Sequence, residues 1–301
     1  MNPYLGELAA LATSLCFSAT STLFTLAGRQ VGSMVVNRTR LVLAVLFLTL
    51  AHRLLSVPLP IYISVERFFW LGASGIIGLV LGDAFLFQAF LLIGPRLSML
   101  LMALAPVMAT LLAWVFLAER LSTAQFAGVL VTLSGIAWVI LERNGQSHLS
   151  EAGRRSYMIG LLFGLGAAAG QALGLITAKK GLGPDFPALS GTLIRMFAAA
   201  TTLWVFTLLR NQAGATLKQL IERPQAVKLI LGGALAGPFL GVTFSMLAIQ
   251  HTQVGVASTL MALPPVILLP VGYYIFQEGF GWQAVLGTFL TMAGVGLLFL
   301  V

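Results

Sequence analysis

The chain has 301 residues, of which 58% are apolar and 9% are charged, and its mean hydropathy is +0.97. This composition excludes an ordinary soluble domain and is typical of a membrane protein. At about 20 residues for each span, the chain has room for roughly ten spans and for no separate catalytic or nucleic-acid-binding domain.

The formal charge of +8 comes from 17 basic and 9 acidic residues, and many of the basic residues stand at the ends of apolar runs. Such residues meet lipid headgroups, so the charge predicts a bilayer partner and no nucleic-acid partner. The single cysteine, Cys16, excludes disulfides and thiolate metal sites within one chain. The three histidines fall at or beyond span ends without ligand spacing, so neither a metal nor a cofactor is expected.

Apolar runs punctuated by turn residues or charges define the predicted helices in chain order. Each run is close to the thickness of the hydrocarbon core. Only the connections 142–156 and 210–225 are long enough to be substantial loops. The ten predicted helices cover residues 4–27, 34–55, 68–92, 96–117, 122–141, 157–178, 188–209, 226–249, 254–276 and 281–301.

The second half of the chain repeats the first. A shift of 159 residues superposes the third to fifth helices of the two halves, and a shift of 155 pairs Arg40 with Arg195 in the second helices. We therefore expect a first five-helix repeat at 1–141, a connecting loop at 142–156 and a second repeat at 157–301. Positions matched by the shift of 159 include Gly82 and Gly241, Phe85 and Phe244, Pro106 and Pro265, Glu119 and Glu278, Thr132 and Thr291, and Gly135 and Gly294.

Five helices in each half is an odd number, so the second half enters the membrane from the opposite side. The predicted fold is therefore an all-α membrane protein with ten transmembrane helices, arranged as two inverted five-helix repeats around a central cavity. Two inverted bundles can exchange shapes around one cavity, and this exchange is a means of alternating access.

Several short motifs recur in order and at fixed spacing, and most are echoed in the second half. They are Gly82-Asp83-Ala84-Phe85, Leu104-Ala105-Pro106-Val107, Glu119-Arg120-Leu121 and the later Pro264-Pro265-Val266. On these residues the chain resembles the EamA-type, ten-helix branch of the drug/metabolite transporter superfamily over nearly its whole length. The resemblance implies a secondary carrier of small metabolites, often an exporter of amino acids, whose halves surround a central cavity.

The four-helix small multidrug carriers depend on a glutamate in the middle of their first helix. The corresponding region here reads Thr13-Ser14-Leu15-Cys16, and Glu7 near the helix end is the only acid of this segment. An antiporter of cationic drugs is therefore not expected.

Asp83 lies in the middle of the third predicted span, where an ionisable group costs about 2.5–3.5 kcal/mol on insertion scales. One interpretation is that its carboxylate binds a coupling proton or a substrate amine. The other is that it makes a hydrogen bond between helices, because the matched residue in the second half is Val242. The sequence leaves both interpretations open.

Polar side chains within the spans are candidates for a substrate cavity. The first helix carries a stripe of hydroxyls, and Gln171 in the sixth helix has an amide that needs partners in lipid. Hydroxyls in a span also bond their own i−4 carbonyls, so packing is the competing interpretation. The predicted substrate-binding residues are Ser14, Ser18, Gln171, Thr177 and Gln88.

Prolines in the fourth and ninth helices remove backbone hydrogen bonds and predict kinks near mid-membrane. These residues are Pro106, Pro264 and Pro265, and their matched positions suit a bend that changes between two states. A purely structural kink is the alternative.

Four charged residues are assigned structural roles. Glu119 and Glu278 end the fourth and ninth helices, where a tight turn compensates for the unfavourable dipole. Arg40 and Arg195 stand within about two turns of a helix start, so we expect them to extend to the headgroups as anchors, although either can in principle bind a carboxylate.

The sequence contains no nucleophile–base set, phosphate loop or zinc spacing, so an enzyme is not expected. The leading hypothesis is a secondary active transporter of small metabolites, an exporter of amino acids or related polar and amphipathic compounds, with protons or another gradient as the driving force. A passive exchanger or facilitator is the first alternative, and a non-transporting sensor or a lipid-modifying enzyme is the second. The expected location is the inner or plasma membrane of a prokaryotic cell, with a monomer sufficient and a homodimer possible.

Overall fold

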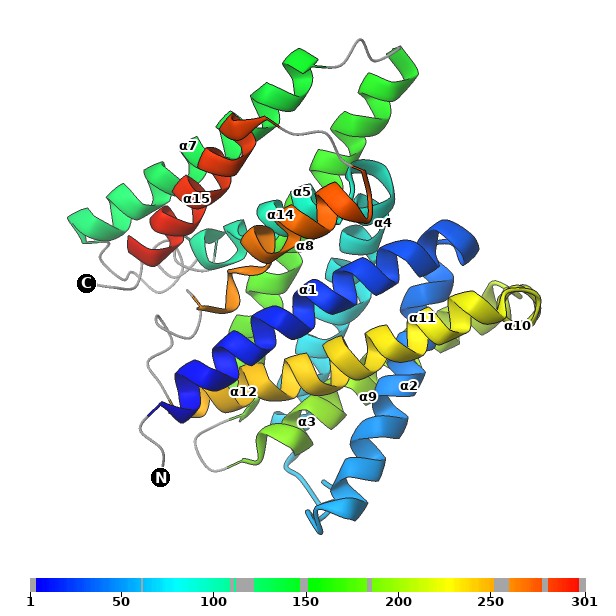
Figure 1. The fold of residues 1–301 in the computed structure, drawn as a ribbon. Helices are drawn as coiled ribbons and strands as arrows, with labels where there is room; N and C mark the ends of the chain where they lie inside the picture. The colour runs from blue at the N-terminus through cyan, green and yellow to red at the C-terminus, as the bar shows by residue number, and fades with distance from the viewer. Residues whose placement is uncertain are drawn as a thin grey trace.

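The computed structural model describes residues 4–60, 62–108, 111, 122–146, 151–182, 186–251, 260–277 and 281–297. Within these ranges the chain forms helices and no strands (Figure 1). The helices are α1 Leu5–Val31, α2 Ser33–Leu54, α3 Val65–Ser74, η1 Gly75–Gly82, α4 Asp83–Ile93, α5 Pro95–Met102, α7 Thr123–Gln146, α8 Glu151–Leu182, α9 Ala188–Leu209, α10 Ala213–Glu222, α11 Pro224–Ala234, η2 Leu235–Gly241, α12 Val242–His251, α14 Pro264–Tyr274 and α15 Trp282–Leu297.

Within the described ranges, seven helical segments are long and apolar enough to cross a bilayer, which identifies a multi-pass membrane protein. Two shorter apolar helices, Pro95–Met108 and Trp282–Leu297, accompany them. The predicted spans 96–117, 254–276 and 281–301 lie partly outside the described residues.

The two predicted loops are largely helical, which corrects the sequence analysis. α7 continues to Gln146 and α8 already begins at Glu151, so most of 142–156 belongs to these helices. α10 occupies most of 210–225. The prediction was wrong because apolar content ends where a chain leaves the hydrocarbon, whereas backbone hydrogen bonding continues into polar turns.

The helices of one half pack against helices of the other half in a reciprocal way. α1 packs along α11, η2 and α12, while α8, the first helix of the second half, packs along α3, η1 and α4. Matched helices of the two halves also pack together, α2 with α9, α5 with α14 and α7 with α15, and Figure 1 shows α7 beside α15 at one edge of the bundle. The core therefore lies between the halves, where side chains such as Phe24, Phe87, Ile230 and Leu268 form one buried cluster.

The helices α2 and α9 run antiparallel. Near the start of α2, the Trp204 indole Nε1 donates a hydrogen bond to the carbonyl of Arg38 at 3.2 Å. Near the end of α2, His52 Nε2 lies 3.1 Å from Ser190 Oγ at the start of α9. α7 and α15 are likewise antiparallel, because Thr132 meets Gly294 and Gly135 meets Thr291.

The π-helical segments η1 and η2 occupy matched places in the two halves. Just before each segment, a hydrogen bond joins the chain to the first helix of the other half. Ser74 Oγ donates to the carbonyl of Gly174 at 2.5 Å, and Thr20 Oγ1 donates to the carbonyl of Gly233 at 2.5 Å. The same contact is thus made twice, with donor and acceptor exchanged between the halves.

Close packing of α7 against α15 gives a first testable prediction. A Cβ on Gly135 would lie 2.5 Å from Thr291 Oγ1 and 2.6 Å from its backbone N, and one on Gly294 would meet the backbone of Thr132. Because backbone atoms cannot give way, Gly135→Ala and Gly294→Ala should each lower the free energy of unfolding by about 1–3 kcal/mol. Thermal unfolding in detergent measures this.

The control is Gly214→Ala in α10, where a Cβ would meet nothing within 4 Å. Equal stability of all three variants and the unmodified protein would contradict the antiparallel packing described above.

Candidate functional site

An ion pair between Arg40 and Asp83 lies inside the bundle. It joins the Nη2 of Arg40 on α2 to the Oδ2 of Asp83, the first residue after the π-helical segment η1. The two side chains are 4% and 13% exposed. Arg40 also donates from Nη2 to the carbonyl of Leu79 in η1 at 3.2 Å. The guanidinium therefore ties α2 to the junction of η1 and α4.

Two further side chains surround Arg40. Its Nε donates to Asn37 Oδ1 at 3.0 Å, and its guanidinium carbon lies 4.8 Å from the centre of the Phe87 ring. Asn37 is fully buried, and its Nδ2 has no hydrogen-bond partner among the residues that the structure describes. Sequence reasoning did not select Asn37 or Phe87. The spacing of Asn37 and Arg40, one helical turn apart and close to a mid-span acid, was a signal for this cluster.

Arg195 on α9 brings a second guanidinium to the same region. It is 4% exposed, and its charge interacts with that of Asp83. Its Nη2 and the Oε1 of Gln171 on α8 each lie 3.7 Å from the point where a Cβ of Gly78 would stand. Arg195 and Gln171 therefore approach η1 beside Gly78 from two different helices.

The structure corrects the predicted position of the two arginines. Both were expected to reach the lipid headgroups, but both are buried, and Arg40 binds a carboxylate of the protein itself. The prediction was wrong because distance from a helix start does not show which face of the helix a residue occupies. A long side chain can turn inward when a partner is available there.

The predicted cavity residues are distributed over several helices. The hydroxyls of Ser18 and Thr177 donate to carbonyls of their own helices, at 2.8 Å to Ser14 and 2.8 Å to Leu173. Ser14 is buried and donates to the carbonyls of Ala10, at 3.3 Å, and Leu260. Gln88 Oε1 accepts a hydrogen bond from Ser33 Oγ at 2.8 Å. Only Gln171 lies beside the charged cluster.

The helices that carry the predicted prolines are interrupted just before them. α5 ends at Met102 and a turn at Ala103 precedes the helical residues 104–108, which include Pro106. In the second half, α14 starts at Pro264, followed by Pro265, after a turn at Ala262. The interruptions fall where a proline clashes with the carbonyl four residues earlier. Glu119 and Glu278 lie outside the described residues.

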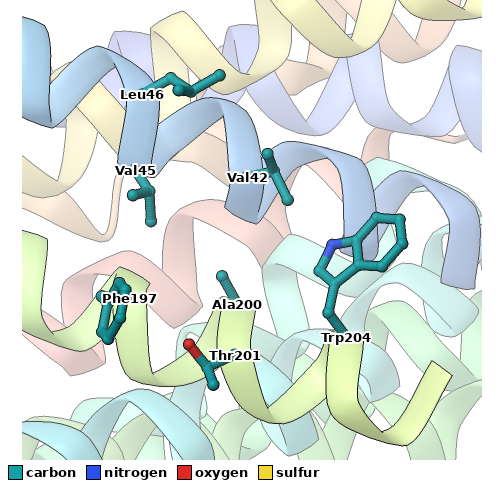
Figure 2. Close-up of a pocket in the computed structure, with 7 residues that line it drawn as sticks. All are labelled: Val42, Val45, Leu46, Phe197, Ala200, Thr201 and Trp204. Carbon is teal, nitrogen blue, oxygen red and sulfur yellow. The ribbon is translucent and has the colours of Figure 1, made fainter. Parts of the chain in front are cut away.

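An apolar groove lies between α2 and α9, and its lining includes neither Arg40 nor Arg195 (Figure 2). Its volume is about 260 Å³. The indole N–H of Trp204, one of its few polar groups, is already bonded to the carbonyl of Arg38. The groove therefore has the character of a lipid-facing surface. Its lining residues are Val42, Val45, Leu46, Phe197, Ala200, Thr201 and Trp204.

The fold and the buried charges define a multi-pass membrane protein with a polar centre. A model of the EamA-like transporter family matches residues 4–141 and 158–300. The chain therefore belongs to the EamA-like transporter family, within the drug/metabolite transporter superfamily, as the sequence motifs indicated.

One solved structure, titled only "Crystal structure of protein", is similar in fold to this chain. The two share 18% sequence identity over 97% of this chain and 96% of that one, with a TM-score of 0.63. No sequence among the curated proteins matches the chain. Within the described ranges, no cluster of three or more His, Cys, Asp or Glu side chains is arranged to hold a metal ion.

The three charges give a second prediction. Asp83→Asn leaves two buried guanidiniums without a carboxylate, so it should lower the free energy of unfolding by about 3–5 kcal/mol. Arg40→Met should cost less, because Asp83 keeps the attraction of Arg195. Unfolding of each variant in the same detergent tests this order.

The matched control is Glu222→Gln, which removes an exposed carboxylate 3.8 Å from Lys218 and should leave stability nearly unchanged. A larger loss for Arg40→Met than for Asp83→Asn would show that Arg195 does not compensate for Asp83.

Proposed function

We propose that this chain is a secondary carrier that moves small metabolites across the membrane by alternating access. The observation that carries the proposal is the reciprocal, antiparallel packing of matched helices, α2 with α9 and α7 with α15. A pseudo-twofold axis in the membrane plane accounts for this packing and implies ten spans in two inverted repeats. Membership of a transporter family supports the same proposal.

Matched irregular segments support a change between two shapes. η1 and η2 interrupt the third helix of each half, and the turns at Ala103 and Ala262 interrupt the fourth. Interruptions of this kind are where helices bend, because fewer regular hydrogen bonds oppose bending there. Pro106, Pro264 and Pro265 act in this proposal as the hinges beside the turns.

The polar residues at the centre of the bundle support the proposal of an amphipathic substrate. Arg40, Asp83, Arg195 and Gln171 supply charges of both signs and an amide, and Phe87 adds an aromatic face. Amino acids and related polar or amphipathic compounds combine these features, and we propose that they are exported. The proposed location is the inner or plasma membrane of a prokaryotic cell, with Asp83 as the group that couples transport to a proton gradient.

Transport is tested with purified protein in liposomes. Liposomes loaded with unlabelled amino acids should accumulate the labelled compound by exchange, whereas protein-free liposomes should not. The panel should also contain organic acids, amines and neutral sugars. If no compound moves, with or without a pH gradient, the proposed function is overturned. Transport that ignores the gradient identifies a passive exchanger.

Coupling is tested with Asp83→Asn in the same liposomes. The variant should lose uptake driven by a pH gradient but keep exchange without a gradient, because neither step of exchange needs the carboxylate to release its proton. Glu222→Gln on the exposed face of α10 is the control. Intact gradient-driven uptake in Asp83→Asn would remove Asp83 from coupling.

A further inference from the structure

The central cluster contains one more positive charge than negative. Arg40 and Asp83 neutralise each other, which leaves Arg195. Among the described residues, no carboxylate lies within ion-pair distance of the Arg195 guanidinium, and its buried Nε has no hydrogen-bond partner. A buried charge that forms no ion pair is unfavourable, so this arrangement favours an anion that enters from outside the chain.

Comparison of the two matched halves shows that the second half lacks a partner acid at the position that matches Asp83. Arg40 and Arg195 are matched residues, and the carboxylate that neutralises Arg40 comes from Asp83. The residue that matches Asp83 in the second half is Val242, which packs against an apolar cluster with Leu193 and Met196. The second half therefore has the guanidinium but not the acid.

The surroundings of Arg195 are suited to an anion. The amide of Gln171 approaches the same point beside Gly78 and can rotate to donate its N–H. Asn37 contacts Arg40, and its buried Nδ2 is a second donor that has no partner in the described part of the chain. Gln171 is half-buried and the Asp83 side chain is 13% exposed, so the cluster borders accessible space.

We propose that Arg195 and Gln171 bind the carboxylate of the transported solute, Arg195 through its guanidinium and Gln171 through its amide. A guanidinium can form two parallel hydrogen bonds with a carboxylate, and these charge-assisted bonds are about twice as strong as neutral ones. The inference rests on the proposed function, because it names the class of solute that the carrier takes.

The carboxylate of Asp83 already forms an ion pair with Arg40, so binding at the proposed site does not depend on a substrate amine. Simple organic acids and amino acids share the carboxylate and should both bind. Amines and amides that lack a carboxylate should bind weakly.

The experiment measures binding to purified full-length protein in detergent by isothermal calorimetry. One probe set is L-leucine, isocaproate, isoamylamine and L-leucinamide, and a second is L-phenylalanine, hydrocinnamate, phenethylamine and L-phenylalaninamide. In at least one set, the carboxylates should bind about tenfold or more tightly than the amine and the amide. Equal binding of isocaproate and L-leucine indicates an organic-acid site, and tighter binding of L-leucine indicates an amino-acid site.

Two variants locate the site. Arg195→Met should weaken carboxylate binding about tenfold or more, and Arg210→Met, an exposed arginine at the end of the same helix, should not. Gln171→Glu places a protein carboxylate beside Arg195, so it should compete with the probe while compensating the buried charge. This variant keeps the test valid if Arg195→Met fails to fold.

Unchanged binding in Gln171→Glu, or amines that bind as well as carboxylates, would overturn the inference. So would the absence of carboxylate binding in both sets. The proposed function would stand if liposomes still transported a cationic or neutral solute, so the two failures can be told apart.

Discussion

The interaction on which the centre of this protein depends is the buried ion pair of Arg40 and Asp83. Each charge alone in a span costs about 2.5–3.5 kcal/mol on insertion scales, and each lowers the cost of burying the other. The guanidinium donates further hydrogen bonds to Asn37 Oδ1 and to the carbonyl of Leu79. Because these partners come from α2, η1 and α4, the pair holds three elements of one half in fixed relation.

Close backbone packing between helices places residues of the second half near the ion pair of Arg40 and Asp83. Ser74 in α3 is bonded to the carbonyl of Gly174 in α8, and a Cβ on Gly174 would lie 3.0 Å from the Cα of Gly78 in η1. As a result, Gln171 of α8 and Arg195 of α9 reach the same region as Asp83. Small residues at helix contacts thus place polar groups from both halves at one site.

The sequence predicted the helical membrane fold and the matched positions of the two halves because both appear as periodic patterns. It did not predict that Arg40 faces Asp83, since the facing side of a helix depends on packing between helices that are distant in sequence. Gln171 was selected because an amide is costly in lipid, and it does lie beside the charges. Ser18 and Thr177 were selected by the same argument, yet their hydroxyls bond to their own helices, which side chains of their length can always do.

Because only one of the two halves supplies an acid to the central cluster, binding of an anion there would favour the closed shape of the proposed carrier. Matched arginines at positions 40 and 195 stand near one acid, so an empty centre carries an excess positive charge. Such a charge is stabilised by water and is unfavourable in a closed, dry centre. In the proposed carrier, an anion that neutralises Arg195 therefore binds the closed shape more tightly than the open one. A ligand with this difference in affinity shifts the population toward closure, which is the step that a carrier must make only with its cargo.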